Sequence, residues 1–354
     1  MNLCFERAKI TGIQLIVPSR EISFDSEMAA YSFNPQQSAK LKQVMGYDRR
    51  RVVEDGVTSS DLAIAGFRVL SESGQLDLRS LDALIVVTQT PDYLMPGTSY
   101  LIHDKLGLRQ DMLCLDINQG CAGFIVGLTT AFSLLNQQNF KRVALVNVDV
   151  VSRLVAEGDR NSRPIIGDAA AITIVESDAR AEPVYGNLKV DGTRWDALMI
   201  PAGGMKIRPS PETAIHTTDP NGNSRALDNL IMKGDAVFNF VMQEVPPMIE
   251  ALMHESKFVL SNVDNFLFHQ PNPFMLKKLA SKLGVRLEKM PIDLVRKYGN
   301  SSGVTIPAVL CTEFDASYFE QPKWVCMAGF GVGLTWGSLL MQLGNLSFVN
   351  VLEI

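Results

Sequence analysis

The segment DINQGCAGFIVGL, residues 116–128, joins a polar turn that contains Gly120 to an uninterrupted apolar stretch. Residues 122–135, AGFIVGLTTAFSLL, continue with apolar side chains on every side of a helix for about four turns. A helix that is apolar all round is buried inside a protein rather than lying on its surface. The segment therefore predicts a central, buried helix, with Cys121 at its first turn.

The order of elements around this helix occurs twice in the chain. In the first half it consists of a strand at 81–89 (LDALIVVTQ), a helical pattern that ends at 106–108 (LGL), the Cys121 turn and helix, and a strand at 142–150 (RVALVNVDV). In the second half the corresponding segments are 263–270 (VDNFLFHQ), a helical pattern that ends at 283–285 (LGV), YGNSSG at 298–303 with an apolar helix after it, and 324–333 (WVCMAGFGVG). Strands that alternate with helices indicate an α/β fold. The repeat predicts two similar halves, residues 1–180 and 181–354, packed face to face, with a long loop at 201–225.

Composition excludes several classes of protein. With 354 residues, 46% of them hydrophobic, the chain is long enough for two domains and a large core. A net charge of −5 gives no electrostatic basis for binding nucleic acid or an anionic membrane surface. The five cysteines are odd in number and show no CxxC spacing, which indicates free thiols rather than a disulfide framework or a zinc site. We therefore expect a globular protein without a metal site.

Neither end of the chain predicts a membrane segment. Glu6 and Arg7 occupy the place where a secretory signal needs its apolar region, so we expect a cytoplasmic protein. Residues 325–352 carry no charge, but five glycines and several amide side chains interrupt them. A spanning helix needs roughly 20 predominantly apolar residues. We interpret this region as buried strands joined by tight turns.

Cys121 is the first candidate for a reactive group. The N-terminus of a buried helix presents free backbone N–H groups and a partial positive charge, and both stabilise a thiolate. We therefore expect a pKa below the ordinary value of about 8.5. The alternative is a small buried residue without chemistry, which is the more common role of a lone cysteine in apolar surroundings.

Two further residues could act with this cysteine. Among the four histidines, His269 alone ends an apolar strand and opens a turn, HQPNP, which directs a polar ring out of a rigid sheet. Asn300 follows Gly299 ahead of an apolar helix, where an N-cap is the alternative role. Papain-like proteases use the same three residue types in this order, but their local cysteine signature is missing and the duplicated α/β order does not suit them.

Four motifs together resemble one family. DINQGCAGF, HQPN, YGNSSG and GFGVGLTWGS, at residues 116–124, 269–272, 298–303 and 329–338, are similar to the β-ketoacyl-acyl-carrier-protein synthase III group of the thiolase superfamily. The resemblance covers essentially the whole chain. It implies a thiolase-like five-layered αβαβα sandwich of two pseudo-symmetric halves, assembled as a homodimer. It also implies that Cys121 accepts an acyl group and that His269 and Asn300 complete the site.

The resemblance implies a condensing enzyme of fatty-acid or related biosynthesis. Cys121 would attack an acyl thioester of coenzyme A or acyl carrier protein, with the backbone N–H groups of Cys121 and Val332 as the oxyanion hole. A malonyl thioester would then lose carbon dioxide, and His269 and Asn300 would stabilise the enolate. No metal or redox cofactor is needed. The alternatives are an acyltransferase that forms an ester or amide without decarboxylation, and a non-catalytic partner subunit of a heteromeric synthase.

Substrate contacts follow from the same resemblance. It assigns them to Arg153, Asp235, Asn272, Gly331 and Met95, of which Met95 would reach the neighbouring subunit's acyl pocket. Four positions depart from the family pattern: Lys40 stands for a coenzyme-stacking Trp, Asp48 for an Arg, Asp235 for a pantetheine-contacting Asn, and Phe274 for a basic residue that docks the carrier protein. Arg49–Arg51, Lys277, Lys278 and Lys282 could still form a basic rim for an acidic carrier protein, or be ordinary solvated side chains.

Overall fold

Two mixed β-sheets form the frame of the protein in the computed structural model, which describes residues 1–31 and 34–354. The first sheet has six strands in the order β17 (Phe348–Glu353), β2 (Ala8–Val17), β8 (Ala169–Ser177), β7 (Arg142–Asp149), β5 (Ala83–Val87) and β6 (Leu113–Ile117). The second has five strands in the order β1 (Asn2–Phe5), β9 (Val184–Val190), β16 (Thr335–Leu343), β15 (Lys323–Gly331) and β14 (Asn265–Phe268). The four strands expected from apolar runs are β5, β7, β14 and β15.

The two sheets repeat one arrangement of strands. β5 runs parallel to β7, and β14 runs parallel to β15. β7 and β15 then pair in antiparallel fashion with β8 and β16. The duplicated order of elements is therefore confirmed as a duplicated sheet topology.

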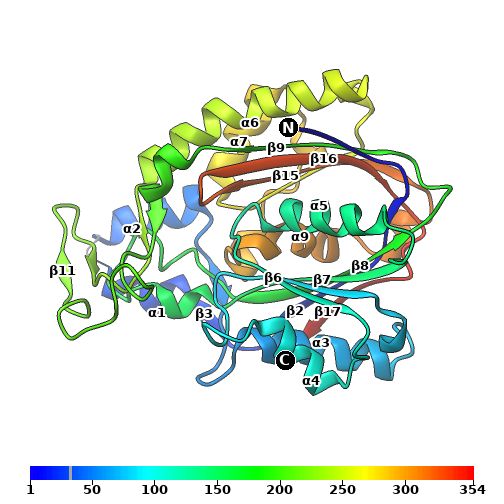
Figure 1. The fold of residues 1–354 in the computed structure, drawn as a ribbon. Helices are drawn as coiled ribbons and strands as arrows, with labels where there is room; N and C mark the ends of the chain where they lie inside the picture. Colours follow the sequence, from blue (N-terminus) through cyan, green and yellow to red (C-terminus); the bar gives the residue numbers. More distant parts are fainter. Residues whose placement is uncertain (32–33) are drawn as a thin grey trace.

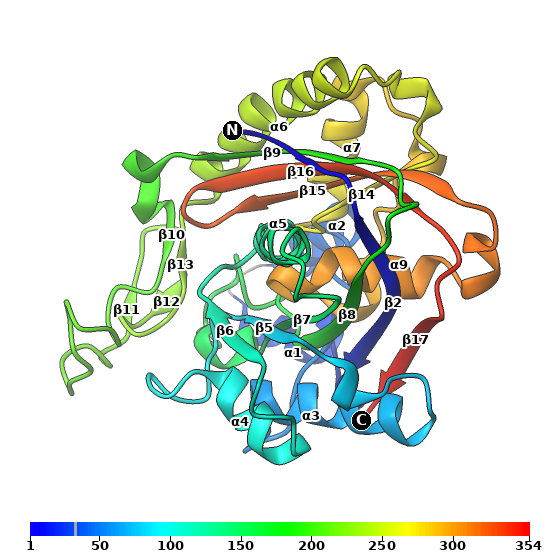
Figure 2. The same ribbon diagram turned by 45° about the vertical axis from the view of Figure 1, so that its right-hand side comes forward.

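The first and last strands cross between the halves. β1 pairs with β9 in the second sheet, whereas β17 pairs with β2 in the first. Figure 2 shows the chain's N-terminus beside β9, in the five-stranded sheet, and its C-terminus beyond β17, in the six-stranded sheet. The division into residues 1–180 and 181–354 stays a prediction, because each sheet takes one strand from across that line.

Helices and sheets alternate in five layers (Figure 1). The outer face of the six-stranded sheet packs against α3 (Ser59–Glu72) and α4 (Thr98–Leu106). α5 (Gly123–Leu135) and α9 (Thr305–Glu313) lie between the sheets. α6 (Gly234–Ser256) and α7 (Pro273–Leu283) cover the five-stranded sheet. The expected αβαβα sandwich is present.

The helix after Cys121 is at the centre of this sandwich. Phe124, Ile125, Leu128 and Phe132 of α5 are fully buried, and burial of such a side chain contributes about 1.5–3 kcal/mol. A Cβ atom at Gly127 would lie 2.6 Å from a methyl carbon of Leu145 in β7, so only glycine lets α5 approach the sheet so closely. The prediction of a buried central helix is confirmed.

Smaller elements close one end of the molecule. They are α1 (Phe24–Glu27), α2 (Pro35–Met45), α8 (Leu294–Tyr298), and the paired short strands β3 (Glu21–Ser23) with β4 (Arg49–Arg51) and β10 (Leu198–Met199) with β13 (Ile231–Met232). The expected loop at 201–225 is irregular except for a short hairpin of β11 (Thr217–Thr218) and β12 (Ser224–Arg225), which lies at the edge of the molecule in Figure 1.

The uncharged C-terminal region forms strands. β15, β16 and β17 account for most of residues 325–352, as the interrupting glycines indicated. In the described part of the chain, no helix has both the length and the apolar character needed to cross a membrane.

Candidate active site

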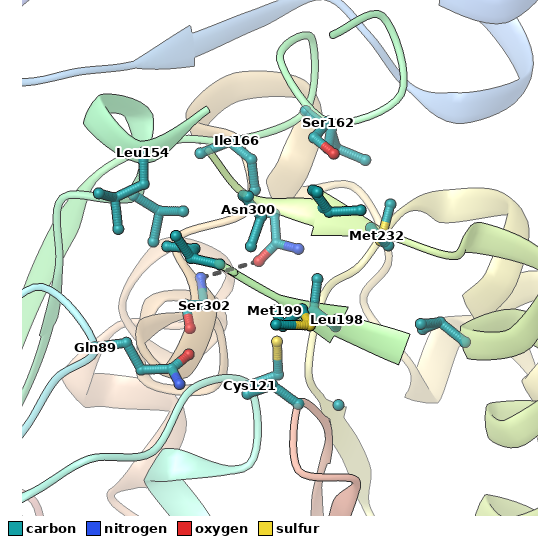
Figure 3. Close-up of a pocket in the computed structure, with 18 of the residues that line it drawn as sticks. Gln89, Cys121, Leu154, Ser162, Ile166, Leu198, Met199, Met232, Asn300 and Ser302 are labelled. Carbon is teal, nitrogen blue, oxygen red and sulfur yellow. Dashed lines mark hydrogen bonds between the residues drawn. The ribbon is translucent and has the colours of Figure 1, made fainter. Parts of the chain in front are cut away.

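A cavity of about 1860 Å³ opens between the two halves, and Cys121, His269 and Asn300 all line it. The rest of the cavity wall is mostly apolar. Both halves of the chain contribute to it, for example through Ile166 and Met232. Figure 3 shows the Cys121 sulfur directed into the cavity, on the side where the Asn300 amide lies. The structure thus brings together three residues that are 31 to 179 positions apart in the sequence.

Cys121 is held in a tight turn at the start of α5. The turn is closed by a hydrogen bond from the Gly123 N–H to the Gly120 carbonyl (2.6 Å). On the opposite side Gly331 packs directly against the cysteine, since a Cβ atom there would lie 2.6 Å from Cys121 Cβ and 2.9 Å from Sγ. The side chain therefore has little freedom except toward the cavity.

The electrostatic surroundings of Cys121 differ from those expected. Burial, and after it the negative charge of Asp149, raise the pKa of the Cys121 thiol to about 11. Hydrogen bonds from the Val332 N–H and the Ser302 hydroxyl oppose this rise but do not cancel it. The prediction of a lowered pKa is wrong, because desolvation and a like charge disfavour the thiolate more than the helix N-terminus favours it. The cysteine is therefore a neutral thiol at pH 7.

His269 directly follows β14 and is buried, with only 2% of its surface exposed. Its Nδ1 lies 2.7 Å from Oγ1 of Thr305, the first residue of α9. Burial lowers the pKa of His269 to about 3, so the ring is neutral at pH 7. Because Thr305 occupies Nδ1, Nε2 is the ring nitrogen left for a substrate.

Asn300 lies between α8 and α9, and hydrogen bonds of both its backbone and its side chain fix its orientation. Its backbone N–H donates to the Ile165 carbonyl (2.6 Å), and its carbonyl accepts from the Gly167 N–H (3.1 Å). The side-chain Oδ1 accepts the Ser302 N–H at 3.0 Å, as the dashed line in Figure 3 marks. This is an Asx turn rather than an N-cap of α9. It leaves the Nδ2 amide group as a hydrogen-bond donor for the cavity.

Two backbone N–H groups lie close to the sulfur atom of Cys121. Those of Val332 and of Cys121 itself both lie within hydrogen-bonding reach of Sγ and stabilise its charged form. Gly331 makes this approach possible because it places no Cβ between β15 and the cysteine. The two donors expected for an oxyanion hole are therefore adjacent in space, although 211 positions apart in the sequence.

Gly331→Ala is expected to displace the cysteine. The new methyl group would overlap both Cβ and Sγ of Cys121, and a displacement of about 1 Å at a reacting group can cost on the order of 10²-fold in rate. We expect acylation of Cys121, measured by intact-protein mass spectrometry, to slow by about that factor. Gly204→Ala is the matched control, because Gly204 also lines the cavity but has no atom within 4 Å of its Cβ position. Equal rates in the two variants would contradict this role of Gly331.

The residues expected to bind substrate lie in different places. Arg153, Asp235 and Asn272 line the cavity, and Arg153 donates to the Glu54 carbonyl (3.2 Å). Asn272 is the N-cap of α7, because its Oδ1 accepts the Met275 N–H at 2.8 Å. Met95 does not line the cavity of its own chain. Its side chain is 83% exposed in a loop, so its expected role depends on a second subunit.

Sequence reasoning missed two residues beside the cysteine. Ser302 lies within hydrogen-bonding reach of the Cys121 thiol, and Asp149 is a fully buried carboxylate whose charge acts on the same thiol. A signal existed for Asp149, since it is a lone charge at the carboxyl end of an apolar strand, where α/β proteins place functional groups. Ser302 had no comparable signal, because serines are common at the start of helices.

Comparison with known proteins identifies one family. Residues 115–192 match the family model 3-oxoacyl-[acyl-carrier-protein] synthase III, and residues 253–343 match its C-terminal model. The chain is 32% identical to a putative 3-oxoacyl-[acyl-carrier-protein] synthase 3 of Campylobacter jejuni, over 99% of this chain and 98% of the relative. It is 31% identical to a β-ketoacyl-[acyl-carrier-protein] synthase III of Streptococcus suis, over 95% and 99% of the two chains.

A solved structure gives the same result for the fold. The 3-oxoacyl-(acyl-carrier protein) synthase of Burkholderia xenovorans LB400 superposes with a TM-score of 0.92 at 30% identity, over 100% of this chain and 99% of that one. The fold and the matched relatives are those of a thiolase-like condensing enzyme, which is an acyltransferase. The chain belongs to the β-ketoacyl-acyl-carrier-protein synthase III family.

Proposed function

We propose that the protein condenses an acyl group bound to Cys121 with a malonyl thioester, with loss of carbon dioxide. The observation that carries the proposal is the meeting of Cys121, His269 and Asn300 in one cavity, with two backbone N–H groups at the sulfur. This set supplies a nucleophile and two separate groups of hydrogen-bond donors. Each half of the reaction develops a negative oxygen, and each group of donors serves one of them.

In the first half-reaction Sγ of Cys121 attacks the carbonyl carbon of an acyl thioester. The tetrahedral oxyanion accepts hydrogen bonds from the N–H groups of Cys121 and Val332, and the carrier thiol then leaves. Each donor of this kind contributes a rate factor on the order of 10²–10³. These donors already lie beside Sγ before substrate binds, so little reorganisation is needed.

In the second half-reaction the malonyl carboxylate leaves as carbon dioxide. The enolate oxygen accepts hydrogen bonds from Nε2–H of His269 and Nδ2–H of Asn300, and its carbon attacks the acyl carbon on Cys121. This role needs the ring proton on Nε2. The Thr305 hydroxyl, which donates to the Ser302 carbonyl at 3.1 Å and lies 2.7 Å from Nδ1, then has to turn its proton to Nδ1. The neutral ring at pH 7 supports a donor rather than a charged acid. No metal or redox cofactor takes part in these steps.

Delivery by acyl carrier protein is supported by family membership and by the surface of α7. Lys277, Lys278 and Lys282 of this helix are exposed, and Lys278 Nζ lies 5.8 Å from the ring centroid of Phe274, which lines the cavity. An acidic carrier would be attracted to these charges. Phe274, which replaces a basic residue of the family pattern, stacks on Phe238 with ring centroids 5.9 Å apart, and both rings line the cavity. We assign the carrier's pantetheine arm, or that of coenzyme A, to the part of the cavity lined by these two rings and by Arg153, Asp235 and Asn272.

A cytoplasmic location stays a prediction. We propose in addition that the protein is a homodimer. Tyr93, Leu94 and Met95 form a loop whose side chains are 61%, 76% and 83% exposed, and Tyr93 and Leu94 line the cavity. Contiguous exposed apolar groups mark interaction surfaces. β6, which is the edge strand of the six-stranded sheet, offers a second contact through its unpaired side.

Charge placed in this loop is expected to separate the subunits. Wild-type protein should have twice the chain mass of 39.0 kDa in multi-angle light scattering, and Met95→Asp should shift it toward the single-chain mass. The control is Val259→Asp, since Val259 is 60% exposed outside this loop and its change should leave the mass unaltered. A wild-type protein that is monomeric at micromolar concentration would overturn the dimer.

The proposed reaction is tested by mass spectrometry with a panel of acyl-coenzyme A and acyl-carrier-protein thioesters. We expect one acyl group on Cys121 by peptide mapping, and release of carbon dioxide once a malonyl thioester is added. No adduct on folded protein would point instead to a non-catalytic partner subunit. An adduct that is transferred to an oxygen or nitrogen nucleophile, without carbon dioxide release, would identify an acyltransferase that does not condense.

A further inference from the structure

Asp149 is a buried carboxylate close to the proposed nucleophile. It ends β7 and is 1% exposed. Its Oδ1 accepts the Gln89 N–H at 2.7 Å and the hydroxyls of Thr88 and Thr90 at 3.2 Å each. Among the described residues no Lys, Arg or His side chain forms an ion pair with it. A buried carboxylate with only neutral partners is costly to keep charged, which calls for a functional reason.

Ser302 connects this carboxylate to the cysteine. Ser302 begins the short helix η7 (Ser302–Val304), which packs against β7, the strand that ends at Asp149. It also lines the cavity together with Cys121, and its hydroxyl lowers the pKa of both the Cys121 thiol and the Asp149 carboxylate. Ser302 also has a φ of 57°, in the left-handed region that non-glycine residues rarely adopt. Such strained residues cluster at active sites, where the surrounding structure holds them for a purpose. Here the backbone conformation places the hydroxyl beside the cysteine, while the Ser302 N–H holds Asn300.

We propose that Ser302 and Asp149 form a proton relay that accepts the proton of the Cys121 thiol during acylation. The inference rests on the proposed function, since it concerns the acylation of Cys121. As the Sγ–C bond forms, the S–H proton passes to Ser302 Oγ, and the Ser302 hydroxyl proton passes to the Asp149 carboxylate. When the C–S bond to the carrier breaks, the departing thiolate takes the proton back. In total, the acyl group moves from the carrier thiol to Cys121, and the thiol proton moves from Cys121 to the carrier.

Asp149 is the better proton acceptor of the two titratable groups that share this site with the thiol. Burial raises the pKa of Asp149 to about 6, whereas burial lowers that of His269 to about 3. His269 is therefore a poor base for a thiol, and it keeps its role as a hydrogen-bond donor to the enolate. Transfer to Asp149 also removes the negative charge that opposes thiolate formation.

Asp149→Asn separates a relay from a purely electrostatic effect. Loss of the charge lowers the pKa of Cys121, so alkylation by iodoacetamide at pH 7.5 should become faster, because that reaction depends on the thiolate fraction. Acylation by a thioester that labels the wild type should instead slow by about 10²-fold, the usual contribution of a general base. The wild-type acylation rate should rise with pH through about 6 as Asp149 loses its proton, and this limb should vanish in Asp149→Asn.

Ser302→Gly tests the connecting hydroxyl without disturbing the fold. Glycine tolerates a φ of 57° and keeps the backbone N–H that holds Asn300. Acylation should slow as in Asp149→Asn, and the double variant should be no slower than either single variant. Asp168→Asn is the control, because it removes an equally buried carboxylate whose hydrogen bonds go to Ser152 and Val53. It should leave both rates unchanged.

The outcomes distinguish this inference from the proposed function. If wild-type protein acquires no acyl group, the proposed function itself fails. If the wild type is acylated and Asp149→Asn speeds acylation in parallel with alkylation, Asp149 acts only through its charge and the relay is overturned. Additive losses in the double variant would likewise contradict a single path through Ser302 and Asp149.

Discussion

Cys121→Ala is expected to abolish acyl-enzyme formation and to lower the rate of condensation by at least about 10³-fold. The thiol is the nucleophile directed into the cavity, and alanine leaves no atom that can carry the acyl group. Decarboxylation of a malonyl thioester should persist, because His269 and Asn300 are unchanged. The measurement is intact mass after incubation with the best acyl donor, followed by a product assay.

The matched control for this variant is Cys114→Ala. Cys114 is a free thiol in β6, half-buried and absent from the cavity wall. Its removal should leave both acylation and condensation unchanged. If the adduct survived in Cys121→Ala and mapped to another residue, Cys121 would be a structural residue only.

His269→Ala and Asn300→Ala are expected to fail at the other half-reaction. Each removes one donor to the enolate oxygen, so decarboxylation of a malonyl thioester should fall on the order of 10²–10³-fold. Acylation should stay within a few-fold of wild type, because the oxyanion donors at Cys121 and Val332 are backbone groups. Carbon dioxide release and acyl-adduct formation, measured on the same samples, separate the two steps.

Asn300→Asp decides between a role in catalysis and a role in the turn. Aspartate keeps the oxygen that accepts the Ser302 N–H, so the Asx turn survives, but it has no N–H to donate to the enolate. We expect decarboxylation to be lost in Asn300→Asp as in Asn300→Ala. Full activity in the aspartate variant would show that the turn is the only function of Asn300.

Local patterns were sufficient for the order of elements and for the central helix. Each buried strand and the all-apolar helix after Cys121 must carry a continuous apolar run, so their positions can be read from short windows. The exchange of β1 and β17 between the sheets was not predictable in this way. These strands are short, and their partners lie more than 150 residues away along the chain or at its other end.

The candidate site, too, could be predicted only in part from local sequence patterns. Cys121, His269 and Asn300 were predicted, because each stands in a motif at the edge of an apolar element and the motifs occur in a family's order. The pKa of Cys121 was predicted with the wrong sign. Its helix N-terminus is a local feature, but burial and the charge of Asp149 come from the packing of β7 and the second half around it.

The amino-acid pattern alone thus specified which residues can carry the chemistry and the order of the layers that hold them. The assembled fold decided their protonation and their partners. Ser302, strained at a φ of 57°, reaches a thiol 181 positions before it and a carboxylate 153 positions before it. Proton affinity depends on desolvation and on charges within a few ångströms, and those distances exist only after the two halves have packed together.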